Sequence, residues 1–277
     1  MIIDSHVHLY PDAIAAKVTP TLAGRFGNAP SFNGTVDGCN ATASAAGIAV
    51  SVNLPVATNP DSVRHTNEFW AAFVPRKKNE TAAAAQPSSR VVSLAAFHPG
   101  VVGKGEEVEW ISRMGFTGIK FHPEYQLFRF NDPDMDEAWA AMQEFGLVAY
   151  LHAGGERVFK APYHSSPAEI AELQRRFPRL RIVAAHLGGF SMWDYAERDI
   201  VGTPVYLDLS HTFNWMPDEQ ILRMVRRHGT SRILFGTDAP WQDPATILGA
   251  FRRMPFTDDE SRAMLCENAA ALLSIDP

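Results

Sequence analysis

Short, almost continuous apolar runs recur along this chain of 277 residues and constrain its fold more than any other feature. Such runs are typical of parallel strands covered on both faces, since a sheet with one wet face would alternate apolar and polar residues. Eight runs are rich in Val, Ile, Leu and Ala, and they span residues 2–6, 48–54, 91–97, 118–122, 148–152, 182–186, 205–209 and 233–238.

Helical patterns fill the segments between the runs. The clearest span residues 106–114, 134–145, 168–177 and 218–228. Proline opens the last three, and glycine follows the first, second and fourth, which are the helix ends that each residue favours. Eight alternating strand and helix units predict an α/β fold, a (β/α)₈ TIM barrel that forms a single domain over residues 1–277. A doubly wound open sheet is the alternative, but no glycine-rich phosphate loop follows the first run.

Two stretches lack a regular pattern. Residues 76–89 combine charged, alanine-rich and Gln-Pro-Ser-Ser segments, which indicates a frayed helix end and a loop. Residues 24–37 contain Gly27, Pro30 and Gly34 and follow the first strand. In a barrel this second stretch lies on the face that carries active-site loops, so we expect it to cover the pocket.

Composition excludes several classes of protein. The formal net charge is −6, and the longest basic run is 76–78, so a nucleic-acid partner is not expected. Cys39 and Cys266 are too few for a disulfide framework and fit a reducing compartment. Asp4 and His6 interrupt the first apolar stretch, and no run is long enough to cross a bilayer. We expect a cytoplasmic protein without a membrane partner.

Potential metal ligands stand at the ends of five predicted strands. His6 and His8 project from the same face of an extended strand, and neutral imidazole is the commonest metal ligand. Because the carboxyl ends of barrel strands converge on one mouth, we expect all of these side chains to meet there. They are His6, His8, His122, His152, His186 and Asp238.

Strand alternation assigns an inward or outward direction to these positions. Four pairs share the inward face: Lys120 with His122, Tyr150 with His152, Ala184 with His186, and Gly236 with Asp238. Their neighbours should point outward to the helices, namely Ile119, Phe121, Leu151 and Phe235.

The motifs at these strand ends resemble the amidohydrolase superfamily, and more narrowly its amidohydrolase-2 branch, which includes aminocarboxymuconate semialdehyde decarboxylase and related hydrolases. The similarity covers nearly the whole chain and lies in residues 4–8, 118–123, 151–154, 185–189, 236–240 and the C-terminal 267–273. It is specific for the superfamily and much less specific for the substrate.

This resemblance implies one divalent ion, usually zinc, held by His6, His8, His152 and Asp238, with manganese or a similar ion as the alternative. His186 then matches a histidine close to the metal-bound water. Zinc with an open position lowers the pKa of its water to about 7. A carboxylate such as Asp238 can both bind the metal and accept the proton of the water, and His186 suits the donor to a leaving group.

The end of the fourth run leaves an alternative open. Some members of the superfamily carry a carboxylated lysine there that bridges two metals. Lys120 lies one inward position below His122, so we expect one metal, an unmodified Lys120 beneath it, and His122 in the pocket wall. Glu124 is either an acid group or second-metal ligand in the pocket, or a solvated loop residue.

Weaker candidates could contact a substrate. Arg129 could bind a carboxylate in a bidentate manner or pack on its neighbouring aromatic rings. Asn53 ends the second strand, and Trp241 follows the last. His211 and Trp215 follow the seventh strand and could wall a small-molecule cleft.

These residues predict a hydrolase in which metal-bound hydroxide attacks a small amide, lactone or ester. A metal-dependent decarboxylase of an unsaturated or aromatic carboxylic acid needs the same ligands, but Arg129 is the only anchor for a carboxylate that the sequence offers. A TatD-type nuclease would want a glutamate where His122 stands, and a non-enzymatic metal-binding barrel should have lost a ligand. We expect a small-molecule substrate, and a homodimer is an open alternative to a monomer.

Overall fold

A computed structural model describes residues 1–75 and 90–276, in which every strand pairing is parallel. Two hydrogen-bonded series run β1-β2-β3 and β4 to β9. The strands are β1 (Ile3–Val7), β2 (Val50–Asn53), β3 (Arg90–Ser93), β4 (Ala95–Ala96), β5 (Gly118–Phe121), β6 (Val148–Leu151), β7 (Arg181–Ala184), β8 (Tyr206–Asp208) and β9 (Ile233–Leu234). The predicted third strand is divided at Leu94 into β3 and β4, so these strands occupy the eight predicted positions. The loop predicted at 76–89 lies outside the described residues.

The last strand returns to the first and closes the barrel. The Ser5 amide donates to the Phe235 carbonyl over 2.8 Å, and the His8 amide donates to the Ala239 carbonyl over 2.7 Å. Asp4 adds a side-chain link, because its Oδ1 accepts from the Thr237 amide over 2.9 Å. These bonds hold the segment after β9 directly against the end of β1.

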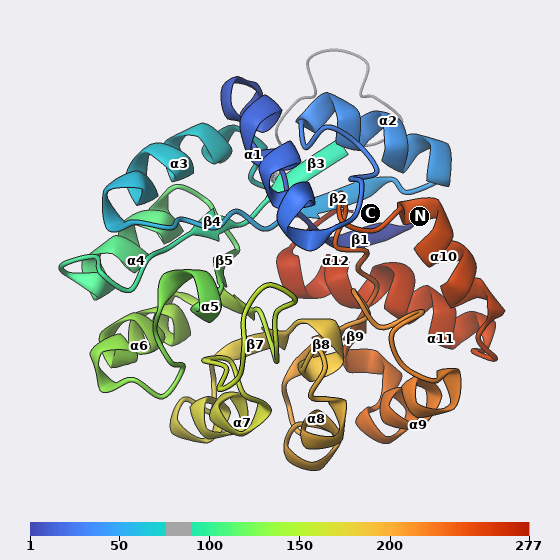
Figure 1. Ribbon diagram of the computed structural model, residues 1–277. Helices are drawn as coiled ribbons and strands as arrows, with labels where there is room; N and C mark the ends of the chain where they lie inside the picture. The colour runs from blue at the N-terminus through green and yellow to red at the C-terminus, as the bar shows by residue number, and fades with distance from the viewer. Residues whose placement is uncertain (76–89, 277) are drawn as a thin grey trace.

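The helices form a ring around the strands (Figure 1). Four predicted helices are confirmed. The ends of α4, α6 and α7 lie within two residues of the predicted ranges 106–114, 134–145 and 168–177, and α9 matches the predicted range 218–228. The α-helices are α1 (Asp12–Phe26), α2 (Val36–Ala46), α3 (Val63–Trp70), α4 (Lys104–Arg113), α5 (Pro123–Gln126), α6 (Asp136–Phe145), α7 (Pro167–Arg176), α8 (Trp193–Asp199), α9 (Asp218–His228), α10 (Pro244–Arg253), α11 (Asp258–Arg262) and α12 (Asn268–Leu273). No helix within the described ranges has the length and apolar character that a bilayer crossing requires.

The apolar interior is divided into two layers by the strands. The outer layer lies between strands and helices, whereas the inner layer fills the barrel and includes Val50, Val148 and Val183. Leu272 and Leu273 of α12 belong to the inner layer, and Arg181 at the start of β7 donates to the Leu272 carbonyl. The C-terminal helix therefore closes the barrel at the strand starts, and the strand ends remain for polar side chains.

The predicted strand alternation holds in most places. Ile119, Phe121, Leu151 and Phe235 all belong to the outer layer, as expected. Ala184 is a correction, because it packs in the outer layer while Val183 and Ala185 face inward. His186 instead reaches the barrel mouth where the chain leaves β7 in a tight turn, with a φ of 58° at His186.

Candidate active site

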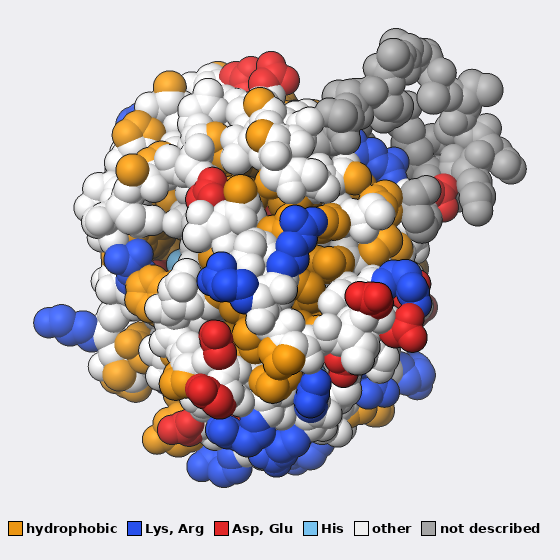
Figure 2. All heavy atoms as spheres, turned by 90° about the vertical axis from the view of Figure 1, so that its right-hand side faces the viewer, with side chains coloured by type: hydrophobic (Ala, Val, Ile, Leu, Met, Phe, Trp, Pro, Cys, Tyr) orange, Lys and Arg blue, Asp and Glu red, His pale blue; other side chains and the backbone are white. Residues whose placement is uncertain are grey.

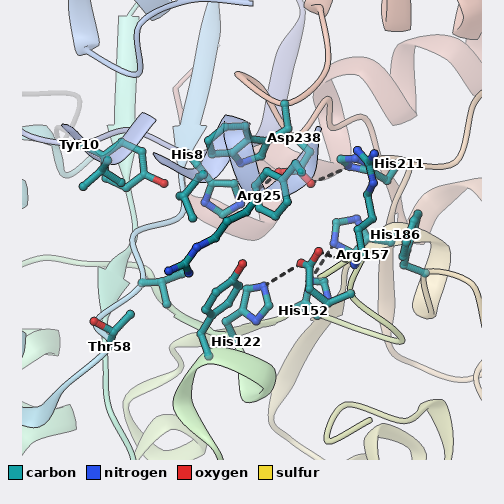
Figure 3. Close-up of a pocket in the computed structure, with 18 of the residues that line it drawn as sticks. His8, Tyr10, Arg25, Thr58, His122, His152, Arg157, His186, His211 and Asp238 are labelled. Carbon is teal, nitrogen blue, oxygen red and sulfur yellow. Dashed lines mark hydrogen bonds and ion pairs between the residues drawn. The ribbon is translucent and has the colours of Figure 1, made fainter. Parts of the chain in front are cut away.

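A cavity of about 420 Å³ opens where the carboxyl ends of the strands meet. The side chains that line it come from segments far apart in the sequence, as the barrel predicts (Figure 3). They include one residue after each of β1, β5, β6, β7, β8 and β9: His8, His122, His152, His186, His211 and Asp238. Of the stretch 24–37, which we predicted to be irregular and to cover the pocket, only Arg25 and Phe26 line the cavity, and both belong to the end of helix α1.

Three predicted metal ligands converge at one point beside the cavity. His6 Nε2 lies 3.2 Å from His8 Nε2, and Asp238 Oδ1 lies 3.1 Å from His8 Nε2 and 3.6 Å from His6 Nε2. Ligands about 2.1 Å from a tetrahedral zinc ion are separated from one another by about 3.4 Å. The spacing of the three atoms therefore fits one divalent ion.

Hydrogen bonds orient both imidazoles toward this point. His6 Nδ1 lies 2.7 Å from Asp208 Oδ2, and His8 Nδ1 lies 3.0 Å from the Leu54 carbonyl oxygen. Both partners are acceptors, so each Nδ1 carries the proton and each Nε2 keeps its lone pair. Burial lowers the pKa of His6 to about 4, which keeps this imidazole neutral and able to bind a metal.

The carboxylate of Asp238 completes the donor set. Its Oδ1 is a buried atom that accepts no hydrogen bond within the described residues. Burial by itself would raise the pKa of Asp238, but nearby His6 and His211 hold it well below its usual value. Two imidazole nitrogens and an ionised carboxylate oxygen thus converge on one point, an arrangement that a cation satisfies.

Asp208 links several parts of the site, and we did not predict this role from the sequence. Its Oδ2 accepts from His6 Nδ1 and, over 2.7 Å, from the Tyr150 hydroxyl, while its Oδ1 accepts from the His186 amide over 2.9 Å. Although burial opposes ionisation, His6 and the hydrogen bonds lower the pKa of Asp208 far below its ordinary value. A charged residue inside the apolar run 205–209 was the available signal.

His186 and Asp238, the predicted catalytic pair, lie together. Their ligand atoms and that of His211 all fall within 4.8 Å of one another. His186 Nδ1 lies 2.8 Å from Ser210 Oγ, and its Nε2 lies 3.0 Å from His152 Nδ1. Burial is the main reason that the pKa of His186 is well below the ordinary histidine value, so the resting imidazole is neutral.

His152, the fourth predicted ligand, occupies a neighbouring group. Its ring stacks on His122 with centroids 4.0 Å apart, and both residues group with Glu156 as potential ligands. His152 Nε2 lies 3.0 Å from the Gly155 carbonyl oxygen, which leaves Nδ1 directed at His186. The structure thus brings His152 to the cavity through His186 and His122 rather than into the group of His6, His8 and Asp238.

His211 has a larger part than its weak sequence signal indicated. Its Nδ1 lies 2.7 Å from Asp238 Oδ2 (Figure 3), whereas the other oxygen of this carboxylate, Oδ1, is the one near His8 and His6. Both His211 and Asp238 have a positive φ, 50° and 62°. Non-glycine residues adopt this conformation rarely, and such positions concentrate at functional sites.

Lys120 lies beneath the three ligands, as the strand alternation predicts. It is fully buried, its Nζ lies 3.5 Å from His6 Nε2, and it also faces the Tyr150 ring at 5.3 Å. Burial lowers the pKa of Lys120 to about 8, while Asp238 and Asp208 oppose this shift. The ammonium group therefore places a positive charge next to the metal ligands.

Three predicted substrate contacts lie elsewhere. Glu124 is buried and binds the His164 amide and imidazole, which fastens the loop before α7. Asn53 joins neighbouring strands, because its Oδ1 accepts from the Leu9 amide over 2.9 Å and its Nδ2 donates to Ser93 Oγ over 3.0 Å. Arg129 pairs with Glu169 and lines a separate surface hollow.

The walls of the cavity contain both predicted and unpredicted residues. Trp241 was predicted to contact a substrate, and it lines the cavity and packs edge-on against Phe26 with ring centroids 4.9 Å apart. Glu156, Arg25 and Arg157 were not identified, because they lie in a loop or on a helix without a strand-end signal. The expectation that 24–37 covers the pocket was the only pointer to Arg25.

Comparisons with known proteins agree with this geometry. No curated protein matches the chain. A 5-carboxyvanillate decarboxylase from Sphingomonas paucimobilis is similar in structure at 17% identity, with a TM-score of 0.71 and 99% of both chains covered. A protein from Pseudomonas putida that is named as a 2-pyrone-4,6-dicarboxylic acid hydrolase has 16% identity and a TM-score of 0.66, with 100% of this chain and 98% of that chain covered.

A third similar structure contains a metal. It is a variant of a 5-carboxyvanillate decarboxylase from Novosphingobium aromaticivorans with bound manganese, at 14% identity and a TM-score of 0.72, with 99% of this chain and 97% of that chain covered. These likenesses establish the barrel fold. The amidohydrolase family matches residues 3–275, and the chain therefore belongs to this family of metal-dependent enzymes.

Proposed function

We propose that the protein hydrolyses a small lactone, amide or ester with one divalent metal ion. The observation that supports this most directly is the convergence of His6 Nε2, His8 Nε2 and Asp238 Oδ1, with both Nδ1 protons taken up by fixed acceptors. The cavity beside these atoms has room for a small molecule.

His6, His8 and Asp238 would hold the ion, and His152 is the proposed fourth ligand. Such an ion supplies Lewis acidity toward water and toward a substrate carbonyl. The donor set of imidazole and carboxylate fits zinc, which we propose as the metal. Manganese is the alternative that the third similar structure supports.

The side chains around this point can move the protons that hydrolysis requires. Water adds its oxygen to the carbonyl carbon, and the bond from this carbon to the leaving atom breaks. We propose that Asp238 accepts a proton from the water, since its carboxylate stays ionised. His186, neutral at rest, would take up this proton and donate it to the leaving atom, which completes the balance.

Decarboxylation of a carboxylic acid is the second candidate. A decarboxylase needs a cationic anchor for its substrate, and Arg129 does not face the cavity. Arg25 and Arg157 do, so this requirement is met by residues that the sequence did not single out. Two of the three similar structures described above are named as decarboxylases.

One screen separates the two reactions. Purified protein, loaded with zinc or manganese and analysed for metal content, is offered lactones, N-acyl compounds and carboxylic acids. Proton release and CO₂ evolution are recorded together. Proton release without CO₂ supports hydrolysis, CO₂ evolution supports the second candidate, and failure to bind any divalent metal contradicts both.

The setting of the enzyme is also a proposal. We propose a cytoplasmic enzyme with a small-molecule substrate and no nucleic-acid partner, which the buried free thiols of Cys39 and Cys266 and the net charge of −6 support. A homodimer remains the alternative to a monomer, and light scattering of the purified protein decides between them.

A further inference from the structure

Helix α1 carries an apolar stripe that is turned to the cavity. The stripe consists of four residues spaced four apart, which places them on one face of the helix: Ile14, Val18, Leu22 and Phe26. Within the described residues, none of them belongs to the outer or the inner apolar layer. All four line the cavity instead. Packing in the core therefore does not explain why this face of α1 is apolar.

Other helices of the ring are arranged in the opposite way. On α9, Ile221 and Val225 pack in the outer layer, whereas Arg223 and Arg227 contact Glu197 on the outside. Lys and Arg side chains also gather along the lower edge of one outer face of the molecule (Figure 2). A helix such as α9 turns its apolar side to the strands. In α1 only Ala15 and Thr19 are buried, and the larger apolar side chains face the cavity.

The stripe connects the active site with the rim of the cavity. Phe26 packs edge-on against Trp241 with ring centroids 4.9 Å apart, and the Trp241 amide donates to the Asp238 carbonyl over 2.9 Å. One end of the stripe thus lies beside the segment that carries Asp238. At the other end, Ile14 is 47% exposed. At a rise of about 1.5 Å per residue, the stripe from Phe26 to Ile14 is about 18 Å long.

Another wall of the cavity limits the width of this apolar surface. After Val56 its residues are polar and lie in α3 or just before it: Thr58, Asn59, Ser62 and Thr66. Arg25 extends from α1 toward Thr58 (Figure 3). The apolar surface of α1 is therefore long and narrow. A compact ring would cover only a small part of it, whereas a linear chain would cover it along its length.

We propose that the substrate is an acyl compound with a linear alkyl chain, which lies along the apolar stripe of α1. The acyl carbon faces His6, His8 and Asp238. Water adds its oxygen to this carbon, the bond to the leaving atom breaks, and the leaving atom takes up the proton, so the product is a linear carboxylic acid. Each CH₂ group that the stripe removes from water strengthens binding by up to about fourfold. This inference rests on the proposed hydrolysis and names its substrate class.

Butanoate and octanoate, which are products of such a hydrolysis, test the proposal by calorimetric titration of the zinc-loaded protein. The two acids have the same carboxylate, so a difference in affinity reports on the alkyl chain alone. We expect octanoate to bind at least about tenfold more tightly than butanoate, because its additional CH₂ groups reach along the stripe.

Substitutions in the stripe locate the site of this preference. Leu22→Ser and Val18→Ser should each reduce the preference for octanoate by at least about threefold, since a hydroxyl group replaces apolar surface. Leu127→Ser and Val102→Ser are the matched controls and should retain it, because both side chains are exposed and lie outside the cavity. Leu22→Trp keeps the stripe apolar but fills part of the cavity, so it should weaken octanoate more than butanoate. Thermal melting verifies that each variant is folded.

Equal binding of the two acids, or a folded Leu22→Ser protein that keeps the full preference, overturns the proposal. A second copy of the chain is the other occupant to test. A dimer that Leu22→Ser converts to a monomer, as seen by light scattering, with unchanged octanoate binding would make the stripe a subunit interface and also overturn it.

Failure of this inference is distinguishable from failure of the proposed hydrolysis. A protein that binds metal and releases protons from short esters, but binds both acids equally, would overturn only the substrate class. A protein that prefers octanoate through Leu22, but releases no protons from any ester, lactone or amide with a linear acyl chain, would overturn the hydrolysis and leave the stripe as a binding site for alkyl chains.

Discussion

The metal-binding side of the cavity and its substrate-facing side are built differently. His6 and Asp208 are fully buried and joined by a 2.7 Å hydrogen bond, and both belong to barrel strands. On the other side, Ile14 of α1 is 47% exposed, and Arg25 has no salt-bridge partner in the described part of the chain. Groups that need fixed geometry lie on the rigid barrel, whereas groups that select a ligand lie on a helix and loops that can vary.

The largest expected effects separate two histidines on the metal-binding side. His186→Asn should lower kcat by about 10²- to 10⁴-fold and leave the metal bound, because the side chain acts on protons. His6→Asn should lose both activity and metal. Turnover and metal content of the purified variants provide the measurement. Near wild-type turnover of the His186 variant would show that we have assigned its role wrongly.

A pair of leucine truncations compares the two sides directly. Leu234→Ala removes a fully buried side chain of β9 and should lower the free energy of unfolding by about 2–5 kcal/mol. Leu22→Ala removes a half-buried side chain of α1 and should change that free energy by less than about 0.5 kcal/mol while it raises KM. Urea unfolding and steady-state kinetics measure both. Equal destabilisation by the two truncations would contradict the distinction.

Asp208 tests whether the metal-binding side depends on a residue that does not touch the ion. Asp208→Asn weakens the acceptor for His6 Nδ1 and should lower metal affinity by about 10- to 100-fold. Competition with a chelator of known affinity measures the change, and thermal melting shows whether the variant is folded. An unchanged metal affinity in a folded variant would remove Asp208 from the account.

His228 of α9 provides a comparison outside the cavity. Burial lowers its pKa from 6.5 to about 4. Between pH 6.5 and pH 4 the unfolded chain therefore binds a proton at His228 that the folded protein does not bind. The contribution of neutral His228 to the free energy of unfolding is fully present above pH 6.5 and is lost as the pH drops through this window. We expect a loss of about 2 kcal/mol between pH 7 and pH 4.5, measured by urea unfolding. His228→Gln should reduce this loss, and an identical loss in the variant would assign it to other groups.

The sequence predicted the parts of the molecule that local patterns determine. Apolar runs located the barrel strands, and proline and glycine located the ends of α6 and α9. Alternation along β5 placed Lys120 beneath His122, and it failed at Ala184 because the chain turns with a positive φ at His186. A backbone conformation that few residues adopt leaves no signal in an apolar run.

Contacts between distant segments could not be predicted in the same way. Nothing near Arg129 in the chain indicates its pairing with Glu169, and nothing near Arg25 or Arg157 indicates that they face one cavity. These relations depend on how loops and helices pack after the barrel has formed. The role of Asp208 could in principle have been predicted from the sequence, because an ionised residue inside a barrel strand requires buried partners.

X-ray diffraction at the absorption edge of zinc or manganese, from crystals grown with the metal, tests the central claim most directly. We predict one anomalous peak within bonding distance of His6 Nε2, His8 Nε2 and Asp238 Oδ1, and the same map shows whether His152 joins them. A peak confined to the group of His122, His152 and Glu156, or no peak at this end of the barrel, would contradict the account.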